Sequence, residues 1–189
     1  QSGLRAPSAL AFDGDGRLFI GHWADAGLWA IGFVDDRGLL YRAVSGLDGV
    51  MHALTWSGPH DALFAVVGNR VLRIDCRDDL TVPSRLTCTT AWFAGGGPDA
   101  VVDDGDSAIG VTFPVRSSGG TWFRQAIGGV WASPTARDVY LTVPATEIVW
   151  KIDSEGRLRR VGGTGMRNPP ANRLDVDGGP ALDSDLNGP

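Results

Sequence analysis

The sequence predicts an all-β fold made of β-propeller blades, each a four-stranded antiparallel sheet, and three observations indicate it. The 189 residues include 27 Gly and 11 Pro, too many turn-forming residues for a helical bundle. Short runs rich in aliphatic and aromatic residues alternate with turns of Gly, Pro and Asp, as in short antiparallel strands. These runs recur three times in the same order at a spacing of about 44 residues, which indicates propeller blades.

The first predicted blade covers residues 1–46. A strand-like run at 7–12 is followed by a Gly/Asp turn at 13–16. The other three runs are 17–21, 28–31 and 39–44. Apolar residues dominate each run and turn-forming residues separate them, so we expect four strands joined by short turns.

The second predicted blade covers residues 47–96 and the third covers residues 126–165. The runs of the second blade are 52–56, 62–66, 71–75 and 89–93. The runs of the third blade are 129–133, 138–142, 148–153 and 158–161. All three blades therefore share one order of strands and turns.

Equivalent aromatic positions set the register of the repeat. Phe12, Trp56 and Trp131 occupy the same place in the first strand of each blade and lie 44 and 75 residues apart. The larger spacing equals one period plus about 31 residues, so we expect an insertion loop at 97–125. Residues 166–189 follow the third blade as an inter-blade connector that leads to a further blade.

The Gly/Asp turn 13–16 and the run after it resemble the NHL-repeat family of β-propellers, as does the stretch 161–165 with the segments 177–181 and 186–189 after it. The resemblance covers the first and third blades well and the second loosely. A related six-bladed propeller of the sugar-dehydrogenase type is the nearest competing family. The resemblance implies a propeller, commonly six-bladed and here of the bacterial, secreted type. It implies no single activity, because one fold hosts many functions.

Three blades are too few to close a propeller, which needs about four to eight. The segment 186–189 repeats the phrase at 4–7 that opens the first blade, as though another blade began there. An open arc would leave a bare apolar sheet face at each end, which a monomer seldom tolerates. We therefore expect other blades to complete the ring, either from a longer parent chain or from a second copy of this chain in a dimer. A β-fold other than a propeller is the alternative.

Cys76 and Cys88 are the two cysteines of the chain. Strand-like residues flank both, which places them opposite each other at the neck of a hairpin. A disulfide there would stabilise the fold by about 3 kcal/mol. Two unpaired buried thiols are the alternative. An even number of cysteines with a pair at the base of a loop favours a secreted, extracellular protein.

Candidate ligand-binding residues gather on one predicted face of the propeller. Loops that leave the second strand of a blade and loops that enter the first strand of the next lie on the same side, so His22, Trp23 and His52 should meet there. Long loops on a rigid scaffold often carry recognition. The insertion adds Arg116, Trp122 and Arg124 to this face. A solvated flap is the alternative interpretation of the insertion.

The remaining Trp residues lie at strand positions where neighbouring blades pack, so we expect them to serve packing between blades. These residues are Trp29, Trp56, Trp92, Trp131 and Trp150.

Two metal sites are candidates. His22 and His52 could hold zinc through neutral imidazole nitrogens, with a third ligand from elsewhere. Such a site would resemble that of the zinc-bearing propeller lyase that cleaves hydroxyglycine peptides. Two hydrogen-bonded or exposed histidines are the alternative.

Calcium is the candidate ion for a run of carboxylates in the connector, which comprises Asp175, Asp177, Asp183 and Asp185. The alternative there is a solvated connector.

The net charge of −5 argues against nucleic acid as a partner, and no apolar stretch reaches the length that spans a membrane.

No complete set of catalytic residues is recognisable, which favours a module that binds a protein, peptide or glycan on its loop-rich face. One alternative is a metal- or cofactor-dependent enzyme, a lyase or oxidoreductase, whose axial site is shared with the other blades. Another is a purely structural half-propeller whose exposed faces serve assembly.

Overall fold

The computed structural model describes residues 4–24, 26–79, 85–99, 102–115, 126–165 and 178–186, and it confirms an all-β fold of three four-stranded antiparallel sheets. The first sheet contains β1 (Arg5–Phe12), β2 (Leu18–Trp23), β3 (Trp29–Val34) and β4 (Leu40–Leu47). The second sheet contains β5 (Met51–Ser57), β6 (Ala62–Val67), β7 (Arg70–Asp78) and β8 (Leu86–Ala94). The third sheet contains β9 (Gly129–Ala132), β10 (Val139–Val143), β11 (Ile148–Ile152) and β12 (Leu158–Gly162). Each sheet follows the order of the sequence, as propeller blades do.

Short 3-10 turns interrupt the strands at η1 (Gly58–His60) and η3 (Ala181–Asp183). Pro59 suits the start of η1 because its fixed φ matches the helical backbone and it has no N–H to satisfy there. Within the described residues, no helix has the length and apolar character needed to cross a bilayer.

A repeated Asp-x-x-Gly turn closes three of the hairpins. Through Oδ1, Asp13, Asp35 and Asp153 each accept hydrogen bonds of 2.8–3.0 Å from the backbone N–H groups two and four positions ahead. The glycine three positions after each Asp has a φ of 76–80°, which a residue with a Cβ rarely adopts. These turns hold β1 against β2, β3 against β4 and β11 against β12.

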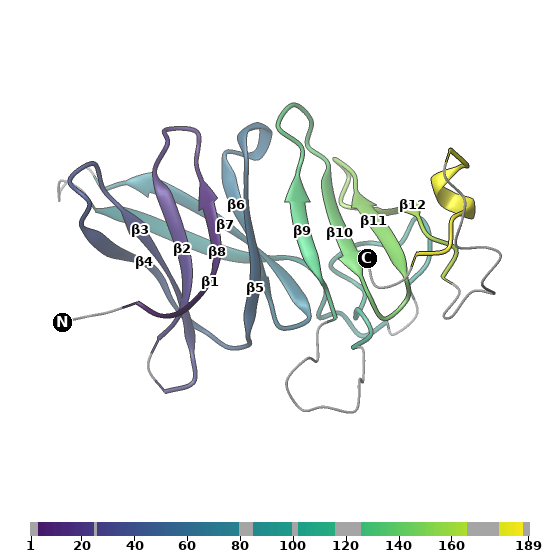
Figure 1. Cartoon of the computed structure of the whole chain (residues 1–189), viewed down its shortest axis with the longest axis horizontal. Helices are drawn as coiled ribbons and strands as arrows, with labels where there is room; N and C mark the ends of the chain where they lie inside the picture. The colour runs from purple at the N-terminus through teal and green to yellow at the C-terminus, as the bar shows by residue number, and fades with distance from the viewer. Residues whose placement is uncertain are drawn as a thin grey trace.

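The three sheets stand side by side with their first strands, β1, β5 and β9, next to one another (Figure 1). The last strands, β4, β8 and β12, form the outer edges of the sheets. The β1–β2, β5–β6 and β9–β10 turns lie at one end of the strands, and the connections that leave β2, β4, β6 and β8 lie at the other (Figure 1). We call this second end the loop-rich face.

Two apolar cores hold neighbouring sheets together. The first interface contains Phe19, Ile31 and Phe33 from the first sheet and Leu63, Ala65 and Val67 from the second. The second interface contains Phe64 and Val66 from the second sheet and Val139, Leu141 and Trp150 from the third. Alternate residues of β6 therefore enter opposite interfaces, as the two-residue period of a strand requires. This explains why β6 is buried along its whole length.

Gly21 allows the first two sheets to approach closely. It lies in the middle of β2, opposite Ala9 of β1 and Ile31 of β3. A Cβ atom at this position would overlap Sδ of Met51, the first residue of β5. A side chain at Gly21 would therefore require either the Met51 side chain or the first sheet to shift.

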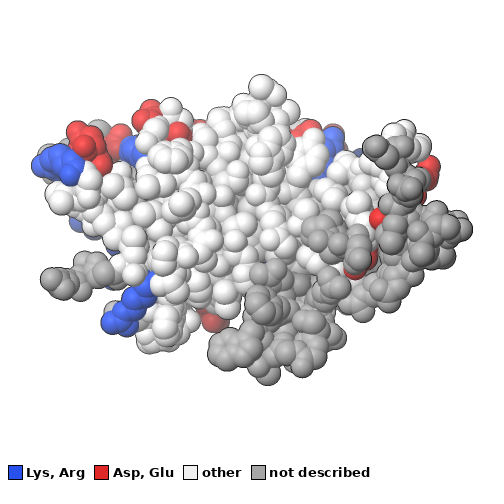
Figure 2. Space-filling model, viewed as in Figure 1, with Lys and Arg blue, Asp and Glu red and all other residues white. Residues whose placement is uncertain are grey.

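The outer sides of the first and third sheets face no other sheet in the described part of the chain. Leu10 and Phe12, whose neighbours on β1 point into the first interface, are 61% and 63% exposed, and Trp131 on β9 is 54% exposed. The surface over the inner strands is almost free of charged residues (Figure 2). The three sheets thus form an open arc, and a closed ring requires other blades.

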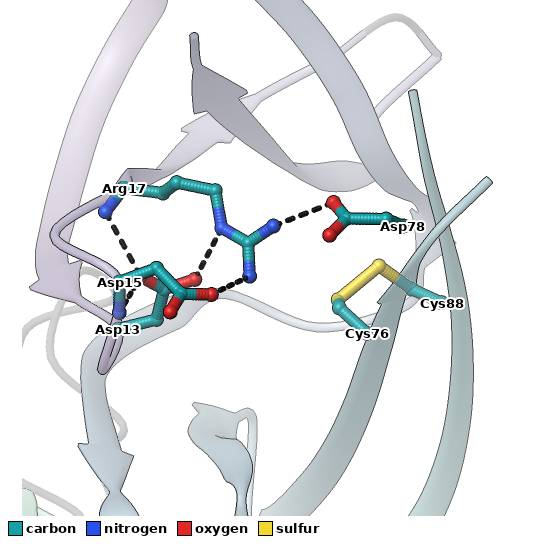
Figure 3. A network of polar contacts seen from close by, with 6 residues as sticks. All are labelled: Asp13, Asp15, Arg17, Cys76, Asp78 and Cys88. Carbon is teal, nitrogen blue, oxygen red and sulfur yellow. Dashed lines mark hydrogen bonds and ion pairs between the residues drawn. A yellow bond between two sulfur atoms is a disulfide. The ribbon is translucent and has the colours of Figure 1, made fainter. Parts of the chain in front are cut away.

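Cys76 of β7 and Cys88 of β8 form the predicted disulfide. The two residues are register partners in neighbouring strands, and their Cα atoms lie 4.1 Å apart. The bond closes the neck of the β7–β8 hairpin (Figure 3), at the end of β7 opposite the β6–β7 turn and so away from the loop-rich face.

Arg17 connects the first two sheets beside this disulfide (Figure 3). Its Nε donates to Asp13 at 2.6 Å and its Nη2 to Asp15 at 2.9 Å, both within its own turn. Its Nη1 donates to Asp78 of β7 at 2.7 Å. The side chain of Asp13 is only 2% exposed, so Arg17 supplies the charge partner that a buried carboxylate requires. We call these four residues the Arg17 network.

Candidate functional site

Exposed aromatic side chains mark the loop-rich face. Trp23 ends β2, and Trp92 lies two residues before the end of β8, so both belong to the end where these strands leave their sheets. Their side chains are 43% and 42% exposed. Flat rings with this much accessible surface can pack against a ligand while the sheet holds them in place.

The two predicted histidines also lie at this face. His22 is the penultimate residue of β2 and His52 is the second residue of β5, and β2 contacts β5. Nδ1 of His22 lies 3.1 Å from the backbone oxygen of Trp23. Burial lowers the pKa of His52, because the charged imidazolium loses hydration there. The structure therefore brings His22, Trp23 and His52 to one end of neighbouring strands, while their role in binding stays a prediction.

Among the residues of the described ranges, the structure assembles no ligand set for either predicted metal site. No three His, Cys, Asp or Glu side chains among them are close enough together to hold one ion. A zinc site at His22 and His52 would need a ligand from outside these ranges. Of the connector carboxylates, Asp185 is 8% exposed and accepts a hydrogen bond from Thr164, whereas Asp175 and Asp177 lie outside the described residues.

Part of the described insertion packs into the core and so differs from a solvated flap. Arg116, Trp122 and Arg124 lie outside the described residues, so their predicted role stays a prediction. Within 102–115, the apolar side chains of Ala108, Val111 and Phe113 are at most 1% exposed and join the core of the second interface. The N–H of Ala108 donates to the oxygen of Gly156 at 2.9 Å, which fastens this segment to the β11–β12 turn. This part of the insertion fills the space between the second and third sheets.

A groove of about 560 Å³ opens on the loop-rich face, between β4 of the first sheet and the outer strands of the second. Four buried apolar residues line its floor, namely Val44, Leu47, Val67 and Leu72. Polar side chains from three separate segments line its walls, namely Ser45, Asp48, Asn69, Arg70 and Thr90. Trp92 completes the wall on β8. The groove is therefore apolar at its base and polar around its rim.

Arg70 is held in place at this groove by two contacts. Its Cζ lies 4.7 Å from the ring centroid of Trp92, a cation–π arrangement. The backbone also passes so close to Arg70 that a Cβ on Gly96 would overlap its side chain. None of the ion pairs formed between described residues involves Arg70. Its guanidinium is therefore fixed in position without a carboxylate partner from that part of the chain.

Sequence reasoning missed this groove and was wrong to assign Trp92 wholly to packing between blades. Trp92 lies on the outermost strand of the second sheet and lines the groove beside the first sheet, so its ring is 42% exposed instead of being covered by that sheet. The sequence of the β7–β8 hairpin contained a signal from which the proximity of Arg70 and Trp92 could have been predicted. Pairing Cys76 with Cys88 places Leu72 opposite Trp92, as the structure shows. Arg70 is then the diagonal neighbour of Trp92 on the same side of the sheet.

Comparisons with known proteins support the propeller fold. No protein-family model and no curated protein sequence matches the chain. An auxiliary nutrient binding protein from Bacteroides thetaiotaomicron is similar in structure, with 18% identity, a TM-score of 0.61, and coverage of 96% of this chain and 41% of that chain. An auxiliary nutrient binding protein from Bacteroides ovatus gives 15% identity, a TM-score of 0.58, and coverage of 86% and 37%. A gluconolactonase from Xanthomonas campestris gives 15% identity, a TM-score of 0.51, and coverage of 84% and 48%.

These similarities are at the level of the fold. At such identities they show a propeller-type architecture and leave the assignment to the NHL family resting on the sequence motifs. The chain spans less than half the length of each of these three proteins.

Proposed function

We propose that this chain is part of an extracellular, NHL-like β-propeller that binds a protein, peptide or glycan ligand on its loop-rich face. The observation that carries the proposal is the pair of exposed indoles, Trp23 and Trp92, near the loop-rich ends of β2 and β8. Each ring stands on a rigid sheet, so it can contact a ligand with little loss of conformational freedom.

Two further observations support parts of this proposal. The Cys76–Cys88 disulfide favours an oxidising, extracellular environment. Two proteins of similar fold are described as auxiliary nutrient binding proteins, which favours binding as the activity, although a gluconolactonase shares the fold as well. Because one fold hosts several activities, the exposed indoles carry more weight than this likeness.

Completion of the ring belongs to the same proposal. The exposed Leu10, Phe12 and Trp131 lie on the outer sides of the arc, where further blades would cover them. These blades come from a longer parent chain or from a second copy of this chain. If the second copy supplies them, the native mass will be twice the 20.0 kDa of one chain. A stable, folded monomer that keeps these three side chains exposed would contradict ring completion.

Binding itself is tested by screening the folded protein against panels of immobilised glycans, peptides and extracellular proteins. We expect at least one ligand, and we expect Trp23→Ala to weaken its binding by about tenfold, roughly 1.4 kcal/mol. Leu39→Ala is the matched control, because Leu39 is similarly exposed but lies in a turn at the opposite end of the strands. Absence of any ligand, or an equal loss in both variants, would contradict the proposal.

A metal-dependent enzyme is the second candidate, and the positions of His22 and His52 at the loop-rich ends of the neighbouring strands β2 and β5 favour it. Elemental analysis of the purified assembly separates the two functions. Stoichiometric zinc or copper that is lost in His52→Ala would support the enzyme. Retention of the metal in that variant would show that His52 does not hold it.

A further inference from the structure

We infer that the groove between β4 and the outer strands of the second sheet binds a saccharide that carries a carboxylate group. The inference rests on the proposed function, because it names a ligand class and a place for it on the same face. It is carried by the juxtaposition of Arg70, the exposed Trp92 ring and a rim of hydroxyl, amide and carboxylate side chains.

The size and lining of the groove suit a small hydrated ligand. Its volume of about 560 Å³ lies within the usual range of small-molecule sites. The hydroxyls of Ser45 and Thr90, the amide of Asn69 and the carboxylate of Asp48 come from three different segments around the rim. Groups of this kind exchange hydrogen bonds with several hydroxyls at once, and a sugar ring presents several hydroxyls.

Arg70 supplies the anchor for the carboxylate. A guanidinium presents planar, parallel N–H donors that match the two oxygens of a carboxylate. The ion pairs among the described residues leave this guanidinium unused. Its contacts with Trp92 and with the backbone at Gly96 already restrict its rotamers, so binding a ligand costs little additional side-chain entropy.

Trp92 supplies an apolar surface beside this anchor. Its side chain is 42% exposed and lines the same groove. The C–H face of a sugar ring can pack on an indole while its hydroxyls point toward the rim, because the indole is flat, apolar and rigid. An acidic sugar therefore engages the ring, the guanidinium and the polar rim together.

Charge and geometry favour this ligand over two others. The carboxylate of Asp48 at the rim and the net charge of −5 disfavour a polyanion such as a heavily sulfated chain. An extended acidic peptide would preferentially add a strand along a free sheet edge. The groove instead lies between the facing sides of two sheets, with Leu72 and Val44 at its floor.

Titration calorimetry on the whole chain, with a galactose trimer in which one unit is replaced by galacturonic acid and the matching neutral trimer of galactose, tests the inference. We expect the acidic trimer to bind about tenfold or more tightly than the neutral one. Arg70→Gln should weaken the acidic trimer by about 10- to 100-fold and abolish this preference, as for loss of a charge-assisted hydrogen bond. Trp92→Ala should weaken both trimers. Arg77→Gln, which removes an exposed Arg on β7 outside the groove, should leave both affinities unchanged.

Arg70→Lys guards against misinterpreting an unfolded variant, because it keeps the charge but loses the planar fork. We expect it to bind the acidic trimer with intermediate affinity. Equal affinity for the two trimers, no binding of either, or tighter binding of an acidic peptide would overturn the inference. Loss of saccharide binding in Trp23→Ala with Trp92→Ala unaffected would overturn it as well, yet leave the proposed function standing. If no member of the ligand panel and neither trimer binds, both the inference and the proposed function are overturned.

Discussion

The two interfaces between neighbouring sheets differ in what occupies the space between their outer strands. In the second interface, the insertion enters this space and buries Ala108, Val111 and Phe113 against the sheets. In the first interface, the same space is the groove, with Arg70 and Trp92 at its wall. One blade architecture thus yields a closed core or an open site, depending on whether an insertion enters between the blades.

The first interface compensates for its open end by bonds at the other end. The Arg17 network and the Cys76–Cys88 disulfide lie beside each other (Figure 3), and both belong to hairpins at the end of the strands opposite the loop-rich face. They connect the turn of the first sheet with β7 and β7 with β8. A binding groove can therefore stay open between sheets that are held together elsewhere.

The largest expected effect comes from matched Leu substitutions in the two interfaces. Leu141→Ala in the filled second interface should lower the free energy of unfolding by about 3–5 kcal/mol, because it leaves a closed cavity. Leu72→Ala at the groove floor should cost about 2–3 kcal/mol, because its cavity is continuous with the groove. Urea denaturation measures both. An equal or larger loss for Leu72→Ala would contradict the distinction between the interfaces.

The second-largest expected effect on stability comes from removing the disulfide. Replacing both Cys76 and Cys88 by Ser should lower the free energy of unfolding by about 3 kcal/mol, because the unfolded chain regains the entropy of an open loop. Thermal unfolding of the double variant beside the oxidised parent measures the loss. A midpoint that does not move would show that this bond does not stabilise the fold.

A smaller effect is expected from the Arg17 network. Arg17→Gln should cost about 1–2 kcal/mol, because it leaves the buried carboxylate of Asp13 without its cation in a partly solvated site. Arg37→Gln, in the equivalent turn, removes a guanidinium that is 62% exposed and should cost less, because solvent screens this pair. Similar losses in the two variants would contradict the assigned link between the first two sheets.

The smallest effect is a pH dependence at His52. Burial lowers the pKa of its ring in the folded state, so the unfolded state binds more protons below the ordinary His pKa of 6.5. Stability from this residue is therefore fully present above that pH and is lost as the pH falls from 6.5 toward the lowered pKa. His52→Gln should flatten the dependence of unfolding free energy on pH in this window. If unfolding free energy varies with pH as steeply in His52→Gln as in the parent protein, the pH dependence does not come from His52.

Local sequence features were sufficient to predict most of the fold. The three sheets follow from short apolar runs such as the one that forms β6 and from the Asp-x-x-Gly turns at Asp13 and Asp153, which act over a few residues. The pairing of Cys76 with Cys88 was predictable for the same reason, since both flank one hairpin.

The candidate site was less predictable, because it depends on how far apart the sheets stand. The exposure of Trp92 depends on the groove between β4 and the outer strands of the second sheet, and no local pattern reports the space between two sheets. The burial of Phe113 depends likewise on a space between the second and third sheets that its own neighbours in sequence do not define. His22, Trp23 and His52 could be placed on one face from strand order alone, although strand order does not assign them a ligand.

Hydroxyl-radical footprinting of the folded chain tests the contrast between the interfaces most directly, because it reports solvent access residue by residue without any substitution. An open first interface and a filled second one predict rapid oxidation of Trp92 and strong protection of Phe113 and Trp150, which are 42%, 0% and 3% exposed. Protection of Trp92 to the level of Trp150, or rapid oxidation of Phe113, would contradict the account.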